Sequence, residues 1–75
     1  MSLKKAFGLH LKQLRKERYI TQEKLADLVD VQDDRTIRAW EAGDDLPSAD
    51  HLEKLCKELH ASIRELFDFD YPEKS

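Results

Sequence analysis

The chain lacks residues or runs of residues that several classes of protein need, and these classes can be excluded. Its single cysteine, Cys56, excludes an internal disulfide and a cysteine-based zinc site. No apolar run approaches the roughly 18 residues of a membrane-spanning helix. No basic segment followed by an apolar stretch opens the chain, as in a secretory signal. At 75 residues the chain is also too short for a two-domain enzyme. We therefore expect one small cytoplasmic domain with no membrane partner.

Charge is abundant but unevenly placed. Charged residues make up 39% of the chain, and the formal net charge is −3. Residues 1–24 hold seven basic and two acidic side chains, whereas residues 25–75 hold six basic and fourteen acidic ones. This asymmetry indicates one electropositive face, although a solvated basic helix gives the same count. The overall excess of acid argues against indiscriminate binding to nucleic acid.

The spacing of apolar residues predicts an all-α fold. Phe7, Leu11 and Leu14 recur at helical intervals, and similar stripes follow along the chain. No alternating strand pattern of useful length interrupts them. We predict a compact bundle of five short helices. They cover residues 3–18, 22–29, 34–42, a stretch that begins after Ser48, and a short segment from Ser62 through Phe67.

Residues suited to helix ends stand between these stripes. Ser, Thr and Asp side chains cap helix N-termini by accepting a free backbone N–H. Ser62 and Glu65 have the spacing of a capping box. Gly43 and His60 occupy stop positions, where we expect the left-handed conformation. The predicted N-caps are Thr21, Asp33, Ser48 and Ser62.

The second and third predicted helices are separated by a short turn, as in a helix-turn-helix. In order, the motifs are Leu14-Arg15, TQEKLA from Thr21, TIRAWEAG from Thr36, and Pro47-Ser48. They resemble the phage repressor and Cro type of helix-turn-helix domain, also called the XRE family. The resemblance predicts a DNA-binding domain over residues 1–67, with residues 68–75 as a tail that is frayed or joins a dimer. The turn departs from the family by one extra residue, near Gln32, and by Asp30 where a glycine is common.

The resemblance implies that the third helix, Asp34–Ala42, reads bases in the major groove. Arg35 is the best candidate for guanine, because its fork matches O6 and N7. Surface ion pairing is the alternative for the arginines, and a helix N-terminal charge is the alternative for Asp34. The implied base contacts are Arg35, Arg38, Asp34 and Ala39.

A second group of residues is implied to hold phosphates. The alternatives are capping for Thr21 and a solvated face for the basic residues of the first helix. Arg15 and Glu41 match a family pair that joins the first helix to the third. The implied phosphate contacts are Gln22, Thr21, Arg15, Lys12, Lys16 and Arg18.

The remaining chemical residues have plainer interpretations. Cys56 and Trp40 are predicted in the core, and the three histidines lack metal-binding spacing. We therefore expect no metal, no cofactor and no enzyme activity. The apolar end of the chain either completes the core or packs against a second subunit. Its residues are Leu66, Phe67, Phe69 and Tyr71.

The sequence therefore predicts a sequence-specific transcriptional regulator. It would bind double-stranded DNA as a homodimer on a two-fold site. The alternative is a protein-interaction module of the same fold, such as an antitoxin or a subunit of a complex. Its acid-rich surface would then meet a basic protein partner.

Overall fold

The computed structural model describes residues 2–71, and every regular element within them is a helix. The predicted all-α bundle is confirmed, and the predicted ends that can be compared lie within one residue of those observed. No helix in this range is long and apolar enough to cross a membrane. The helices are α1 (Leu3–Glu17), α2 (Gln22–Leu28), α3 (Asp34–Ala42), α4 (Ala49–Leu59) and α5 (Ile63–Leu66).

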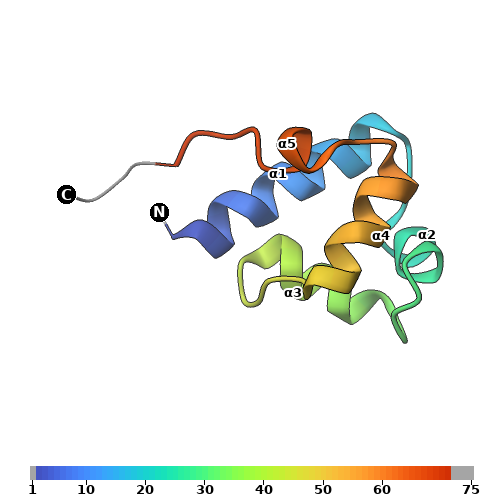
Figure 1. Ribbon diagram of the computed structural model, residues 1–75. Coiled ribbons are helices and arrows are strands. Elements are labelled where there is room, and N and C mark those ends of the chain that lie inside the picture. The colour runs from blue at the N-terminus through green and yellow to red at the C-terminus, as the bar shows by residue number, and fades with distance from the viewer. Residues whose placement is uncertain (1, 72–75) are drawn as a thin grey trace.

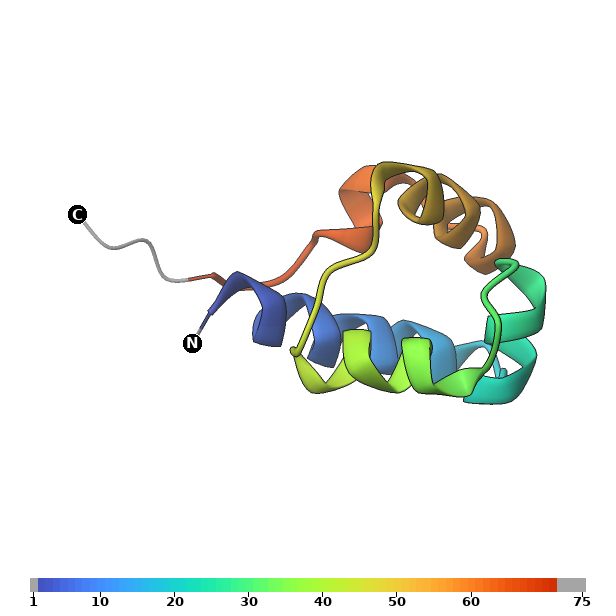
Figure 2. The same ribbon diagram turned by 90° about the horizontal axis from the view of Figure 1, so that it is seen from below.

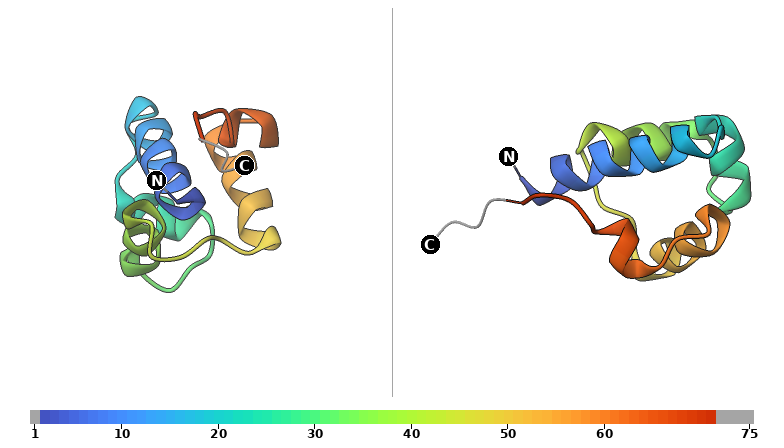
Figure 3. Two further views of the ribbon diagram at one scale, coloured as in Figure 1. Left: turned by 90° about the vertical axis from the view of Figure 1, so that its left-hand side faces the viewer. Right: turned by 90° about the horizontal axis from the view of Figure 1, so that it is seen from above.

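The helices form two groups around the core (Figure 1). α1 and α3 lie side by side along their lengths, and α4 with α5 forms the facing group (Figure 3). α2 closes one end of the molecule and is followed directly by α3 (Figure 2). α1 and α2 therefore both pack against α3, and its opposite side is left open.

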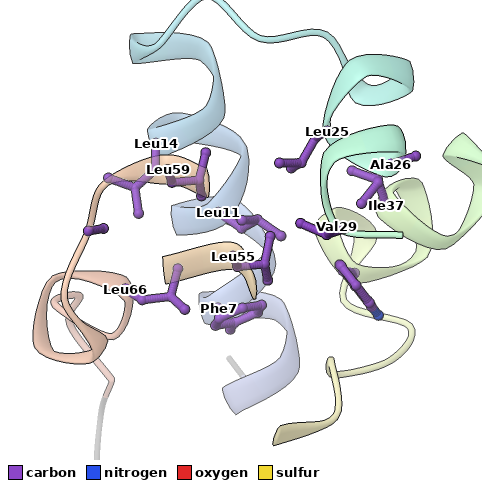
Figure 4. Packing of buried hydrophobic residues seen from close by; sticks show 12 residues of the cluster. Phe7, Leu11, Leu14, Leu25, Ala26, Val29, Ile37, Leu55, Leu59 and Leu66 are labelled. Atoms are coloured by element: carbon purple, nitrogen blue, oxygen red, sulfur yellow. The ribbon is translucent and has the colours of Figure 1, made fainter. Parts of the chain in front are cut away.

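The core lies between the two groups (Figure 4). Burial of one such large apolar side chain stabilises the fold by about 1.5–3 kcal/mol. Trp40 is in the core as predicted, whereas Cys56 is only half-buried against it, and this burial raises the pKa of its thiol. The fully buried large side chains come from all five helices: Phe7, Leu11, Leu25, Val29, Ile37, Leu55, Leu59 and Leu66.

The apolar end of the chain completes the core. Leu66 is fully buried, the Phe67 ring centroid lies 5.1 Å from that of Phe7, and Phe69 packs against the cluster. Tyr71 is 45% exposed and stands apart from it. The predicted tail therefore contributes Phe69 to the packed domain, and its residues 72–75 lie outside the described residues.

Each helix begins at a side chain that accepts a backbone N–H, so the predicted N-caps are confirmed. The capping box is present, with 3.0 Å between Ser62 Oγ and the backbone nitrogen of Glu65 and 3.0 Å for the reciprocal bond. The backbone N–H of Ser62, which donates to the Glu65 carboxylate, holds the pKa of Glu65 below its usual value. The N-caps are Ser2, Thr21, Asp33, Ser48 and Ser62.

The first four helices end in one shared motif. A residue with positive φ follows the helix, and the next backbone N–H bonds back to a carbonyl of the last turn, as in a Schellman motif. Gly43 (φ 80°) and His60 (φ 54°) were predicted in this role and are confirmed. Tyr19 (φ 58°) and Asp30 (φ 60°) fill it in the other two helices. Asp30 therefore occupies the conformation of the turn glycine that it replaces.

His60→Gly is expected to leave the free energy of unfolding unchanged or to raise it by up to about 1 kcal/mol. A residue with a Cβ is strained by about 1–2 kcal/mol in the left-handed conformation, and glycine removes this strain. Glycine also raises the conformational entropy of the unfolded chain, which lowers stability and offsets part of the gain. Urea unfolding followed by circular dichroism measures the difference. The matched control is Glu53→Gly on the exposed face of α4, which should lose about 1 kcal/mol. An equal loss for His60→Gly would show that the imidazole makes a needed contact.

Candidate nucleic-acid interface

α3 has one face in the core and one in solvent. Ile37, Trp40 and Glu41 are buried, and this face holds the helix against the rest of the domain. Arg35 and Arg38 are exposed on the other side. The predicted base-contacting arginines therefore lie on the outward face, where nothing in residues 2–71 covers them.

Each exposed arginine of α3 is bonded to an aspartate at the start of the helix. Asp33 Oδ2 accepts from Arg35 Nη2 at 2.9 Å and from Arg35 Nε at 3.2 Å. Arg38 Nη2 donates to Asp34 Oδ2 at 2.9 Å. The side-chain hydrogen bond from Arg35, with that from its backbone N–H, holds the pKa of Asp33 below its usual value. The ion pairing that the sequence left as an alternative is therefore present, but the guanidinium groups remain accessible.

Arg15, Gln22 and Glu41 form a polar cluster that joins the first three helices. Arg15 Nε donates to Glu41 Oε2 at 2.6 Å, and Arg15 Nη2 donates to Glu41 Oε1 at 3.1 Å. Gln22 Nε2 donates to the same Oε1 at 2.9 Å. The Arg15 and Glu41 side chains are only 9% and 4% exposed. The predicted pair is thus a buried two-point contact, and it reaches α2 as well as α1 and α3.

The cluster satisfies its buried groups and leaves one donor at the surface. Arg15 Nη1 donates to the carbonyl oxygen of Ile20 at 2.8 Å, which ties the α1–α2 link to the same guanidinium. With these bonds Arg15 has a positioning role, and only 9% of its side chain stays exposed for the predicted phosphate contact. The amide nitrogen of Gln22 carries two N–H groups, of which Glu41 accepts one. The second remains available to an external acceptor, because the Gln22 side chain is only half-buried.

The remaining predicted phosphate contacts divide between surface and scaffold. Lys12 and Lys16 are exposed on α1 beside a shallow hollow. Thr21 Oγ1 accepts from the backbone N–H of Lys24 at 3.0 Å, so this oxygen serves as a cap. Thr21 is exposed beside Gln22 and keeps its hydroxyl proton for an external acceptor.

Arg18 donates to two carbonyl oxygens of the domain, and its predicted phosphate contact stays a prediction. Its Nε donates to the carbonyl oxygen of Leu59, and its Nη1 donates to that of Leu14 at 3.3 Å. A cation is favourable at the C-terminus of a helix, where carbonyl groups lack partners. Arg18 therefore fastens the end of α4 to α1, and we leave it out of the interface proposed below.

Gly8 is a positioning residue that periodicity did not single out. A Cβ built there would lie 2.4 Å from the carbonyl oxygen of Trp40 and 2.6 Å from that of Glu41. α1 and α3 therefore meet backbone to backbone, at the end of α3 that carries Glu41. The available signal was a glycine inside an otherwise regular helical stripe, which costs helix stability and therefore suggests a packing reason.

The histidines make structural contacts. His10 Nε2 lies 2.7 Å from the carbonyl oxygen of Glu65, and its ring packs on Phe69 with centroids 5.5 Å apart. His51 Nδ1 lies 3.0 Å from Ser48 Oγ, and its ring lies 5.3 Å from Trp40. His10 therefore joins α1 to the C-terminal end of the domain, and His51 joins α4 to Trp40 of α3.

Proteins of known sequence or structure resemble this chain. The family described as helix-turn-helix matches residues 11–66. No curated protein sequence is similar enough to match. The restriction-modification controller protein C.AhdI from Aeromonas hydrophila is 34% identical with a TM-score of 0.76, over 85% of this chain and 94% of that one. The P22 c2 repressor, solved with a synthetic operator, is 30% identical with a TM-score of 0.77, over 85% and 96%.

The clp gene regulator ClgR from Corynebacterium glutamicum is 26% identical, with a TM-score of 0.82 over 88% of this chain and 69% of that one. All three are described as controllers, repressors or regulators.

Proposed function

The chain belongs to the helix-turn-helix family of the phage repressor and Cro type, and we propose that it regulates transcription by reading double-stranded DNA with α3. One observation carries the proposal. The buried face of α3 is locked to α1 and α2 through Glu41, while its opposite face offers two exposed arginines. Such a helix has the rigidity and the donors that major-groove readout needs.

In the proposed complex α3 lies in the major groove. Arg35 donates to guanine, and the other outward side chains of α3 meet neighbouring base edges or phosphates. The second N–H of Gln22 and the hydroxyl of Thr21 donate to a phosphate beside α2. Lys12 and Lys16 add charge from α1. The further base contacts that we propose are Arg38, Asp34 and Ala39.

The regulator is proposed to act in the cytoplasm as a homodimer. A single α3 spans only one half-site, whereas related operators place two half-sites about one helical turn apart. Selected DNA sites should therefore be two-fold symmetric, and sedimentation should show two chains per duplex.

The acids around α3 favour one second candidate, a protein-interaction module with a basic partner. Asp33 and Asp34 begin the helix, and Asp45 lines the same open hollow as Arg35. Binding of random duplexes at several salt concentrations separates the candidates. A DNA-binding regulator loses affinity steeply as salt rises, because each phosphate contact releases counterions. No binding even at low salt would favour the interaction module.

Arg35→Ala and Gln22→Ala are expected to have different effects on DNA binding. Loss of a two-point base contact should cost about 1–3 kcal/mol and flatten one position of each half-site. Loss of a phosphate contact should lower the affinity for all DNA sequences nearly equally, because phosphates carry no sequence information. Binding-site selection with random duplexes, followed by titration of the selected and scrambled sites, measures both.

Arg35→Ala and Gln22→Ala control for each other, since the two residues lie on adjoining helices. Arg38→Ala is a third variant, which tests the register of α3. If Arg38→Ala flattens the motif while Arg35→Ala leaves it unchanged, the proposed register of α3 is wrong by about one turn. If neither Arg35→Ala nor Arg38→Ala changes DNA binding, α3 does not read the DNA sequence.

A further inference from the structure

The two carboxylate oxygens of Asp33 have different partners. Oδ1 accepts the backbone N–H of Arg35 at 2.9 Å, which is the N-cap of α3. Oδ2 accepts from Nε and Nη2 of the Arg35 guanidinium, at 3.2 and 2.9 Å. One side chain therefore both begins the helix and restrains the arginine that follows it.

The restraint leaves the recognition edge of Arg35 free. A guanidinium carries five N–H groups in a rigid plane, and Asp33 takes the pair along the Nε side. Three groups remain, two on Nη1 and one on Nη2, and they include a parallel pair along the outer edge. Guanine O6 and N7 accept a pair of this kind. The Arg35 side chain is 81% exposed, so this edge can be reached.

From this geometry we propose that Asp33 is a positioning residue that determines specificity, because it presents the outer edge of Arg35 to guanine. The proposal rests on the DNA-binding function above. A long side chain fixed before binding loses less conformational freedom on contact, so the correct base gains affinity. A mobile arginine would reach phosphates and wrong bases as readily as guanine.

Capping does not require the charge of Asp33, and a negative charge at a helix N-terminus adds only a small gain in stability. Exposed ion pairs add little to folding, and this pair is exposed. Serine caps a helix about as well as aspartate and carries no charge. A carboxylate beside DNA also repels phosphates. Its restraint of Arg35 is the effect that offsets this repulsion.

The test compares wild type with Asp33→Ser, Arg35→Ala and the double variant, each as the full chain. Serine keeps an oxygen for the cap and removes the second oxygen that holds Arg35. Binding-site selection should show the preference for guanine at one position of each half-site reduced roughly 2- to 10-fold in Asp33→Ser. Affinity for random duplexes should stay equal or rise, because a negative charge is lost. In the Arg35→Ala background, the serine substitution should change no position of the motif.

Three results would overturn the inference. If Asp33→Ser binds all DNA sequences more weakly and has a lower Tm, Asp33 has a capping role alone. An unchanged guanine preference in Asp33→Ser, with a flattened position in Arg35→Ala, would refute the restraint and keep the proposed function. No DNA binding by wild type would remove both. If Asp33→Ser does not fold, Asp33→Asn repeats the test, since asparagine also caps but is uncharged.

Discussion

Glu41→Ala is expected to lower the free energy of unfolding by about 3–5 kcal/mol, because it leaves the Arg15 guanidinium buried without its partner. Two of the three guanidinium nitrogens of Arg15 donate to Glu41, and the Arg15 side chain is 9% exposed. For a domain of this size the loss should lower Tm by more than about 12 °C. Thermal unfolding followed by circular dichroism gives the value.

Two further variants test this reason. Glu41→Gln keeps an oxygen and the shape but removes the charge, so its loss should be smaller. The double variant Arg15→Met with Glu41→Leu replaces the pair by apolar groups and should recover much of the stability, because a lone buried charge costs more than no charge. A loss below about 1 kcal/mol for Glu41→Ala would mean that water reaches Arg15 and the cluster is not structural.

Gly8→Ala is expected to destabilise the domain by about 2 kcal/mol or more, because overpacking that costs about 3 kcal/mol is offset only in part by the gain of about 1 kcal/mol from alanine's higher helix propensity. The added Cβ would lie 2.4 Å and 2.6 Å from two carbonyl oxygens of α3, which are backbone atoms and cannot rotate away. α1 and α3 must therefore separate. Urea unfolding measures the loss, and the sign alone distinguishes crowding from helix propensity.

The control for Gly8 lies on the same helix. Gln13→Ala changes an exposed position of α1 and should alter stability by no more than about 0.5 kcal/mol. Because the crowding falls at Trp40 and Glu41, Gly8→Ala should also weaken DNA binding in molecules that remain folded. A stable Gly8→Ala variant with unchanged DNA binding would show that the two helices can part without moving the reading face.

Local chemistry explains why the helices could be predicted from the sequence. Apolar spacing and capping side chains act within one or two turns, so Thr21, Asp33 and Ser48 mark helix starts by themselves. Gly43 and His60 were recognisable as ends for the same reason. Tyr19 was not, because a bulky side chain with positive φ is the opposite of the usual preference.

The site was less predictable because its contacts join residues far apart in sequence. The Arg15–Glu41 pair came from family resemblance, and nothing in local spacing indicated that Gln22 shares the same carboxylate. Arg18 could not be told from its basic neighbours, because its two acceptors, the carbonyl oxygens of Leu59 at the end of α4 and of Leu14 in α1, become apparent only in the folded chain. The close approach at Gly8 depends on how α1 crosses α3, which periodicity does not specify.

Under the proposed function, the division of α3 into a buried face and an open face bears on how the protein can change its DNA target during evolution. Ile37, Trp40 and Glu41 tie the helix to its neighbours, while Arg35 and Arg38 take no part in the core. Replacement of the outward pair therefore need not cost the protein its fold, since surface positions tolerate exchange. Substitutions at these few surface positions can therefore change the preferred operator sequence, while the buried residues that hold α3 stay the same.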